Sequence, residues 1–498
     1  MNVNPITRLD YPDPDVIRVE DTYYMVSTTM HFMPGCEILQ SFDLVHWEHV
    51  TYVYETLDHT DAQQLKSGQN IYGQGMWAAS LRYHEGRFYI CFVANDTRKT
   101  YLYTSEKIDG PWKKQLIEGF YHDGSLLFDE DGRNYIVYGN DEIWITELNE
   151  DLTAPKKDGL HRLLVSDHKN PELGYEGSHI QKINGYYYIF LVHSLRDRWM
   201  RTEACFYSDS LEGEFTGGDV LCDDRGYCGQ GVAQGGIVDT PDGKWYAMLF
   251  QDSGAVGRIP ILLPVIWKDH FPFFGQNGHV PEEIEVHSTR PGYIYQPLVG
   301  SNDFCNGLLP RWQFNHDPDP RYYHLDALQG TYTITTREVC TELTQAVNTL
   351  TQRMSYPSCA AEVTVDASAL KEGDVAGLCA LQGCYAAVGI TKHHGKYEVL
   401  MLDKKEDGIL DMTEGTVVES HQMDFRLEAD FCNMKDEARC YYRVNKGDWL
   451  PIGTVHKLYF KLDHFTGCRF GLFCYAAEET GGSACFRDFK YYDVDEIS

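Results

Sequence analysis

Three acidic residues of this chain stand at the same point of an internal repeat, just before a strand-like run. Asp123 and Glu176 each lie twelve residues before a tyrosine that anchors the repeat, and Asp13 lies eleven residues before another. Trp77 and Gln234 hold this position in the two remaining copies. Carboxylates held close together split their pKa values, so one stays protonated near neutral pH while another is ionised. Such groups serve general acid and general base catalysis, for example of glycoside hydrolysis, and a tryptophan offers a face to a sugar ring.

The repeat that carries these residues is a tight turn followed by an aromatic-rich strand. Its five copies read VEDTYYMVSTT, HEGRFYICFVA, EDGRNYIVYGN, INGYYYIFLVHS and PDGKWYAMLFQD. The anchoring tyrosines, 65, 46, 53 and 58 residues apart, are Tyr24, Tyr89, Tyr135, Tyr188 and Tyr246. This spacing predicts a β-propeller of five four-stranded blades. The innermost strands of a propeller run in the same direction around one axis, so we expect the five equivalent positions to converge on one end of the channel.

The repeat ends near residue 290, and residues 296–304 (QPLVGSNDF) resemble a linker. Beyond it come the strand-like runs TYTITT, AAEVTVD, YEVLMLD, KLYFKLDH, RFGLFCYA and FKYYDVD, without the blade turn. Such runs are typical of a two-sheet sandwich. We therefore predict an all-β chain, with a five-bladed propeller as the catalytic domain over residues 1–295 and a β-sandwich over residues 303–498.

Net charge, the first residues and the cysteines exclude further partners and locations. The chain has 498 residues, with 43 Lys and Arg against 74 Asp and Glu, a formal net charge of −31. Such a surface repels phosphate backbones and anionic lipids, so we expect no nucleic-acid or membrane partner. The first residues show no secretory signal, and the 15 cysteines form no CxxC pair, so we expect reduced thiols and a cytoplasmic location. A homo-oligomer stays open.

Several motifs resemble glycoside hydrolase family 43. They are YPDPDVIRVEDTYYMVST with Asp13, YHDGSLLFDEDGRNYIVYG with Asp123 and YEGSHIQKINGYYYIF with Glu176. MPGCEILQSFDLVHWEHV and GMWAASLRYHEGRFYI also look like the first and second blades of that family. The segment from Leu350 to Gly383 resembles the concanavalin-like jelly-roll sandwich that follows the propeller in its β-xylosidases and arabinofuranosidases.

The resemblance implies a role for each motif residue. Asp13 would be the general base, Glu176 the general acid, and Asp123 the group that raises the pKa of the acid and orients it. Arg258, in GAVGRIPILLPVIW, looks like the arginine of the family that meets the sugar from the last blade, and Trp77 looks like its substrate-packing aromatic residue.

The fifth-blade position departs from the family. Many members carry a histidine there that helps to hold a calcium ion or a water cluster in the channel, whereas this chain has Gln234. An amide oxygen is a weak calcium ligand, so we predict no metal ligands and no required cofactor, with a channel calcium ion left as the alternative.

Other acidic motifs have simpler interpretations. Asp317 and Asp319, in NHDPDPR, lie outside the phase of the repeat and are typical of turns. Residues 129–131 (DED) resemble a calcium loop but directly precede a glycine and a strand, which favours a hairpin turn.

The sequence therefore predicts an exo-acting, inverting glycoside hydrolase. Its substrates would be pentose-containing oligosaccharides from hemicellulose, from which it would release terminal α-L-arabinofuranosyl or β-D-xylosyl units. The fifth-blade sequence favours arabinofuranoside slightly, and activity on both is compatible with it. The alternative is a non-catalytic carbohydrate-binding protein, since propellers and sandwiches both host lectins.

Overall fold

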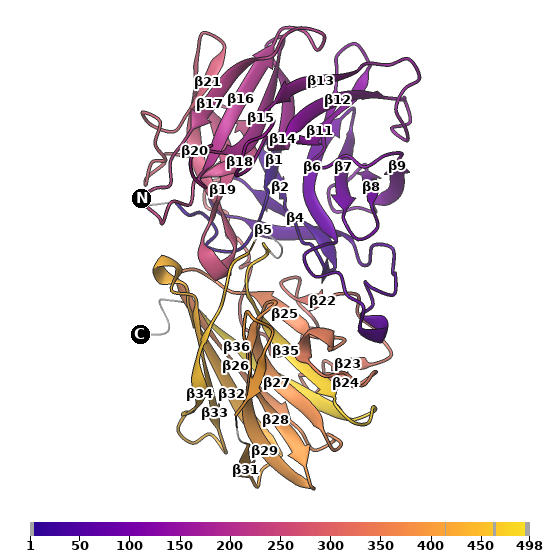
Figure 1. Ribbon diagram of the computed structural model, residues 1–498, viewed down its shortest axis with the longest axis vertical. Helices are drawn as coiled ribbons and strands as arrows, with labels where there is room; N and C mark the ends of the chain where they lie inside the picture. Colours follow the sequence, from indigo (N-terminus) through magenta and orange to yellow (C-terminus); the bar gives the residue numbers. More distant parts are fainter. Residues whose placement is uncertain (1–3, 414, 462–464, 494–498) are drawn as a thin grey trace.

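The protein, seen in a computed structural model that describes residues 4–413, 415–461 and 465–493, consists of two all-β bodies in contact (Figure 1). The propeller lies above and the sandwich below in that view. The described helices are single 3₁₀ turns: η1 (Lys66–Gly68), η2 (Gly254–Val256), η3 (Leu343–Gln345) and η4 (Cys432–Met434). None of the helices in these ranges has the length and apolar content needed to span a bilayer.

Five four-stranded antiparallel sheets form the propeller, as the repeat predicts. The innermost strands are β1 (Asp15–Val19), β6 (Met76–His84), β10 (Ser125–Phe128), β14 (Glu176–Ile183) and β18 (Ala233–Asp239). Each contacts the next, and β18 contacts β1, so the ring is closed. The N-terminal segment fastens this closure, because the backbone N–H groups of Ile6 and Tyr11 donate to carbonyls of the last blade.

The outer strands follow in chain order within each blade. They are β2 (Thr22–Val26), β4 (Gly35–Ser41) and β5 (Glu48–Tyr54); β7 (Arg87–Ala94), β8 (Lys99–Ser105) and β9 (Lys113–Ile117); β11 (Asn134–Asn140), β12 (Glu142–Leu148) and β13 (His161–Ser166); β15 (Tyr186–Ser194), β16 (Arg201–Ser208) and β17 (Thr216–Leu221); β19 (Trp245–Asp252), β20 (Arg258–Lys268) and β21 (Phe271–Phe274). Apolar and aromatic side chains pack between neighbouring blades, which fixes the angle between them.

Irregular backbone marks one end of the innermost strands. The ladders of β6, β14 and β18 each carry a bulge within their first four residues. Asp13, Asp123 and Gln234 have left-handed backbones, with φ of 52°, 48° and 62°. Bulges re-aim side chains, and left-handed non-glycine residues cost free energy that functional sites commonly carry. The five equivalent positions of the repeat lie at this end.

The sandwich consists of two antiparallel sheets with an apolar core between them. One sheet contains β22 (Gln313–Asn315), β25 (Leu350–Arg353), β27 (Asp374–Leu381), β28 (Tyr385–His393), β29 (Lys396–Lys404), β30 (Leu410–Met412), β31 (Thr416–Val418) and β35 (Arg469–Ala476). The other contains β23 (Tyr323–Asp326), β24 (Thr331–Thr335), β26 (Ser358–Asp366), β32 (Gln422–Asp430), β33 (Glu437–Arg443), β34 (Leu450–Lys457) and β36 (Ser483–Asp493).

The two bodies share a strand and buried ion pairs. β3 (Phe32–Met33) belongs to the first blade in sequence, yet it pairs with β22 at the edge of the sandwich sheet. Nearby, Arg353 of the sandwich forms a buried ion pair of 2.8 Å with Glu37 of the propeller. The predicted domain limits at residues 295 and 303 fall in the irregular segment between β21 and β22 and stay predictions.

Most expected strands are present, but one is wrong. The run at residues 457–464 (KLYFKLDH) is not a strand where it is described: β34 ends at Lys457, residues 458–460 are irregular, and residues 462–464 lie outside the described ranges. The described strands on either side, β34 and β35, belong to different sheets, and Phe465 contacts Trp77 of the propeller. The turn expected at residues 129–131 is confirmed, since the N–H of Gly132 donates to the carbonyl of Asp129. All 15 cysteines are free, as expected.

Candidate active site

A cavity of about 260 Å³ lies at the bulged end of the channel, where the propeller meets the sandwich. It is lined by Asp13, Trp77, His122, Asp123, Asn140, Leu173, Glu176, Trp199, Arg201, Gln234, Arg258 and Phe465. The structure therefore brings together all six residues singled out in the sequence. Its size is below the range of about 300–1,000 Å³ typical of sites for drug-sized ligands, so the cavity suits one small ring.

Asp13 is held in a fixed orientation by two donors. Its Oδ1 accepts a hydrogen bond of 2.7 Å from Nη1 of Arg258, and its Oδ2 accepts one of 2.5 Å from the hydroxyl of Thr28. The side chain is almost fully buried. The guanidinium on one oxygen and the hydroxyl on the other fix the orientation of the carboxylate, as a base requires.

Asp123 and Glu176 come from adjacent blades and are coupled through the backbone. Oδ2 of Asp123 accepts from the N–H of Gly177, 2.9 Å away, directly after Glu176. Gly177 has φ of 65°, and a Cβ there would lie 2.7 Å from the side chain of Gln234, so only glycine fits. Oε2 of Glu176 accepts from Nδ2 of Asn140 at 2.7 Å.

His122 adds a basic group that the sequence analysis did not single out. Its Nε2 lies 3.5 Å from Oδ2 of Asp123 and 3.5 Å from Oε2 of Glu176. Burial opposes the charged imidazolium, but the charge of Asp123 and the hydrogen bond and charge of Glu176 outweigh it and raise the pKa of His122 to about 9.

The pKa values of the two acids depart from the sequence-based expectation. Burial and the charges of Glu176 and Asp13 raise the pKa of Asp123 to about 6, although His122 opposes this. Burial also acts to raise the pKa of Glu176, but His122, Arg201 and Arg258 outweigh it and lower that pKa. This direction differs from the expectation that Asp123 raises the pKa of the acid, because His122, Arg201 and Arg258 act on Glu176 in the opposite sense.

A buried carboxylate organises the arginines of the site. Asp252 accepts from Nε of Arg258 at 3.2 Å and from Nε of Arg201 at 3.1 Å. Both arginines are the first residue of the third strand of their blade, β20 and β16. Arg201 stands 13 residues after Tyr188 and Arg258 stands 12 after Tyr246, a repeat signal that could have revealed Arg201 in the sequence.

The sandwich supplies one wall of the cavity. Phe465 packs edge-on against Trp77 with ring centroids 5.3 Å apart, and the guanidinium carbon of Arg258 lies 4.1 Å from its ring centroid. Asp10 holds this loop in place: its two carboxylate oxygens accept from the N–H of Arg258 at 2.7 Å and from the N–H of Gly467 at 2.8 Å. Phe465 lies outside the repeat and more than 400 positions from Asp13, so nothing in the sequence indicated that it lines the cavity.

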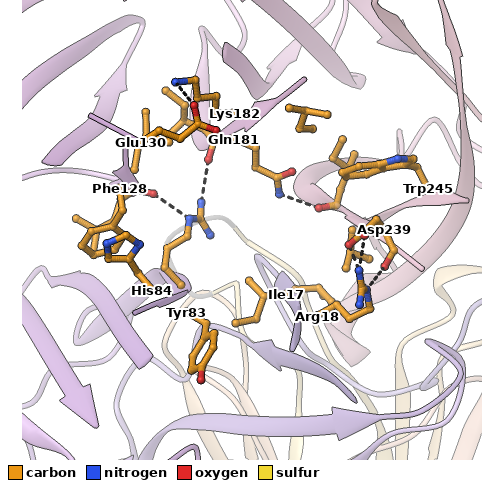
Figure 2. Close-up of a pocket in the computed structure, with 18 residues that line it drawn as sticks. Ile17, Arg18, Tyr83, His84, Phe128, Glu130, Gln181, Lys182, Asp239 and Trp245 are labelled. Carbon is orange, nitrogen blue, oxygen red and sulfur yellow. Dashed lines mark hydrogen bonds and ion pairs between the residues drawn. The ribbon is translucent and has the colours of Figure 1, made fainter. Parts of the chain in front are cut away.

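The opposite end of the channel has a larger cavity, of about 460 Å³, with a different character (Figure 2). Its charged side chains pair with one another, as Arg18 does with Asp239 and Lys182 with Glu130. The residues that line this cavity therefore do not include a cluster of converging carboxylates like the one at the bulged end. We therefore place the chemistry at the bulged end.

The middle of the channel does not fit a calcium ion. Asp15 is its buried carboxylate, and both of its oxygens are already engaged. Oδ2 accepts from Nη1 of Arg82 at 2.8 Å and from the N–H of Leu81 at 2.7 Å, while Oδ1 faces Nδ1 of His179 at 3.1 Å. Calcium prefers six to eight oxygen ligands, whereas this site already contains a guanidinium. No step below is routed through a metal.

Comparisons with known proteins agree with this geometry. Residues 3–272 match the family model of the glycosyl hydrolases family 43. The chain belongs to this family. Residues 301–492 match the model of the beta xylosidase C-terminal concanavalin A-like domain. This family 43 enzyme is thus a glycoside hydrolase built from a five-bladed propeller and a concanavalin-like sandwich.

Individual relatives cover nearly the whole enzyme. A solved structure of a bifunctional GH43-CE protein from Bacteroides eggerthii is 42% identical, with a TM-score of 0.92 over 99% of this chain; the chain spans 64% of that protein. A beta-xylosidase from Formosa agariphila is 26% identical over 99% of this chain and 89% of its own length. A xylosidase/arabinosidase from Butyrivibrio fibrisolvens is 24% identical over 99% of each chain.

Proposed function

We propose that this enzyme removes single terminal pentose units, α-L-arabinofuranosyl or β-D-xylosyl, from hemicellulose-derived oligosaccharides, with inversion at the anomeric carbon. The observation that carries the proposal is the convergence of three carboxylates from three blades on one cavity of about 260 Å³. Phe465 of the sandwich forms one wall of it. A cavity of this size admits one sugar ring, so cleavage would occur at a chain end.

Asp13 acts as the general base in this proposal. Arg258 fixes one oxygen and Thr28 the other, so the carboxylate is oriented to accept a proton from water. Asp13 belongs to blade one and Glu176 to blade four, on different sides of the channel. Inverting enzymes separate the two groups by about 6.5–9.5 Å to leave room for the attacking water, and opposite blades suit that spacing.

Glu176 acts as the general acid, with Asp123 beside it. Asn140 and the backbone link between Gly177 and Asp123 orient the two acids, while the negative charge of Asp123 favours retention of a proton in this part of the cavity. Protonation of the leaving oxygen contributes typically 10²–10⁴-fold to such reactions, so the acid is the main target for mutation.

Trp77, Gln234 and Arg258 bind the sugar in this proposal. Trp77 offers an aromatic wall to the apolar face of the ring, and its indole N–H has no partner among the described residues, so it is available to a sugar hydroxyl. Arg258 keeps guanidinium N–H groups beyond those used by Asp13 and Asp252. Gln234 reaches the cavity from the fifth blade.

The two candidate sugars call for a direct comparison. The curated relatives cited above carry the names beta-xylosidase and xylosidase/arabinosidase, which supports activity on both pentoses. The purified enzyme would be assayed on p-nitrophenyl α-L-arabinofuranoside and p-nitrophenyl β-D-xyloside. We expect turnover of at least one, with the arabinofuranoside slightly preferred. Binding of pentose without turnover of either substrate would reject the proposal and favour a carbohydrate-binding role.

A further inference from the structure

One basic side chain stands among the acids of the cavity. His122 lies in the loop before β10, directly before Asp123, and about one-fifth of its side chain is exposed. His122 does not occupy the position of the repeat that the three carboxylates share. Its ring meets that of Trp77 edge-on, with centroids 5.9 Å apart, so the imidazole is fixed against an aromatic wall.

The ring directs one nitrogen toward both acids. Nε2 is 3.5 Å from Oδ2 of Asp123 and from Oε2 of Glu176, and it makes no hydrogen bond of ordinary geometry with the described residues. Catalytic hydrogen bonds are often long in a free enzyme and shorten when substrate binds. A small rotation would therefore join His122 to Glu176.

We propose that His122 acts through Glu176: it stores the proton that Glu176 delivers to the leaving oxygen and hands it over when a sugar fills the cavity. The proposal rests on the assignment of Glu176 as the general acid.

The charges around His122 support this role. Three carboxylates face it, from Asp123 on its own loop, Glu176 on β14 and Asp13 before β1, and they raise the pKa of His122 to about 9. Arg201 and Arg258 face Glu176 and favour its ionised form. At neutral pH the free cavity thus keeps its proton on His122, while Glu176 is a carboxylate.

Each proton is accounted for in the cycle. Nε2 of His122 gives its proton to Oε2 of Glu176, which leaves a neutral imidazole and a carboxylic acid. Glu176 then protonates the glycosidic oxygen as the C–O bond breaks, and water attacks the anomeric carbon and gives its proton to Asp13. After product release Asp13 loses that proton to solvent, and His122 takes one up from solvent. The net change is the consumption of one water molecule.

Entry of the sugar provides the trigger. A charged pair of imidazolium and carboxylate is favoured by water, whereas the neutral pair of imidazole and carboxylic acid is favoured when water is expelled. Phe465 and Trp77 line the cavity, so a bound ring displaces water from beside both groups. Binding would therefore move the proton onto the group that uses it.

The test compares His122→Phe with His84→Phe. His84 lies at the opposite end of the channel, stacked on Phe128, and serves as a control for the same change in the same propeller (Figure 2). The pH dependence of kcat/KM would be measured on an unactivated pentose disaccharide and on a dinitrophenyl pentoside, whose leaving group departs without protonation.

We expect His122→Phe to shift the alkaline limb for the disaccharide downward by at least one pH unit, with about tenfold or greater loss at pH 8 and little loss at pH 5. The dinitrophenyl substrate and the His84→Phe variant should keep the wild-type profile. An unmoved alkaline limb in His122→Phe, even with a changed KM, would overturn the proposal. His122→Gln, which keeps polarity without titrating, should behave like His122→Phe and serves if the latter does not fold.

A readout besides activity separates this proposal from the assignment of Glu176. By ¹⁵N NMR, His122 should titrate near pH 9 in the wild type and at lower pH in Glu176→Gln, since the pair shares one charge. Titration at the usual histidine pH would overturn the proton store while leaving Glu176 as the acid. Wild-type activity that chelation abolishes and a divalent metal restores would also overturn it, because His122, Asp123 and Glu176 would then hold an ion.

Discussion

The propeller and the sandwich contribute to the same cavity in different ways. The propeller supplies Asp13, Asp123 and Glu176 by repetition, since the same position of each blade points to the same end of the channel. Among the described residues, the sandwich supplies only Phe465, which lies between β34 and β35. Repetition thus brings the carboxylates together, whereas a single loop forms one wall of the pocket. The first contribution can be read from a sequence, and the second cannot.

The largest effect should come from the repeated carboxylates. Glu176→Gln and Asp13→Asn each remove a proton-transfer group and should lower turnover of an unactivated pentoside by about 10²–10⁴-fold, with the thermal melting curve unchanged. Steady-state assays on the disaccharide check this. Near wild-type turnover in either variant would mean that the repeat does not carry the chemistry.

A smaller effect should follow from the sandwich loop. Phe465→Ala removes one wall of the cavity and the cation–π contact with Arg258, which is worth about 0.5–2 kcal/mol. We expect kcat/KM to fall about tenfold, mostly through KM, while the pH profile stays in place. A moved alkaline limb would show that the sandwich also takes part in proton transfer.

Asp10 should affect catalysis through the same loop. Asp10→Asn replaces one of two acceptors by a donor and leaves the N–H of Arg258 or of Gly467 without its partner, at a cost of about 1–3 kcal/mol in unfolding free energy. We expect KM to rise a few-fold. In a double-mutant cycle, this rise should vanish in the Phe465→Ala background; an additive effect would show that Asp10 acts through Arg258 instead.

The smallest effect concerns the contact between the two bodies. The carboxylate of Asp317, on the sandwich side, lies 2.7 Å from Nδ1 of His59. Asp317 is buried, and burial raises its pKa from 3.8 to about 6. A raised carboxyl pKa stabilises the fold below pH 3.8, and this contribution is lost as pH rises through about 6.

Asp317→Asn should therefore remove part of the fall in unfolding free energy between pH 4 and 7. Urea unfolding of both proteins at several pH values checks this, and the shared contributions of Asp10, Asp374 and Asp436 cancel in the comparison. Parallel curves for the two proteins would show that Asp317 does not titrate in this range.

The sequence predicted what depends on the repeat and missed what depends on tertiary placement. The five equivalent positions lie together because blades repeat their geometry. His122 does not occupy the repeated position. It stands out only because Asp123 and Glu176, from neighbouring blades, lie beside its ring. Asp317 lies in a bend, in line with the prediction of a turn residue, and its carboxylate also contacts His59 of the propeller, which only the packing of the two bodies reveals. Phe465 directly follows a run whose apolar residues predicted a strand, and its contacts with Trp77 and Arg258 of the propeller arise only from tertiary packing.

The stereochemistry of the first product tests the central assignment most directly. Proton NMR during hydrolysis of an α-L-arabinofuranoside or a β-D-xyloside identifies the anomer before mutarotation. Because Asp13 and Glu176 belong to two non-adjacent blades, one and four, that line the same cavity, we predict that the inverted anomer appears first, β-L-arabinofuranose or α-D-xylose. Initial formation of the retained anomer would require the two carboxylates to lie about 5–5.5 Å apart and would contradict their assignment as base and acid.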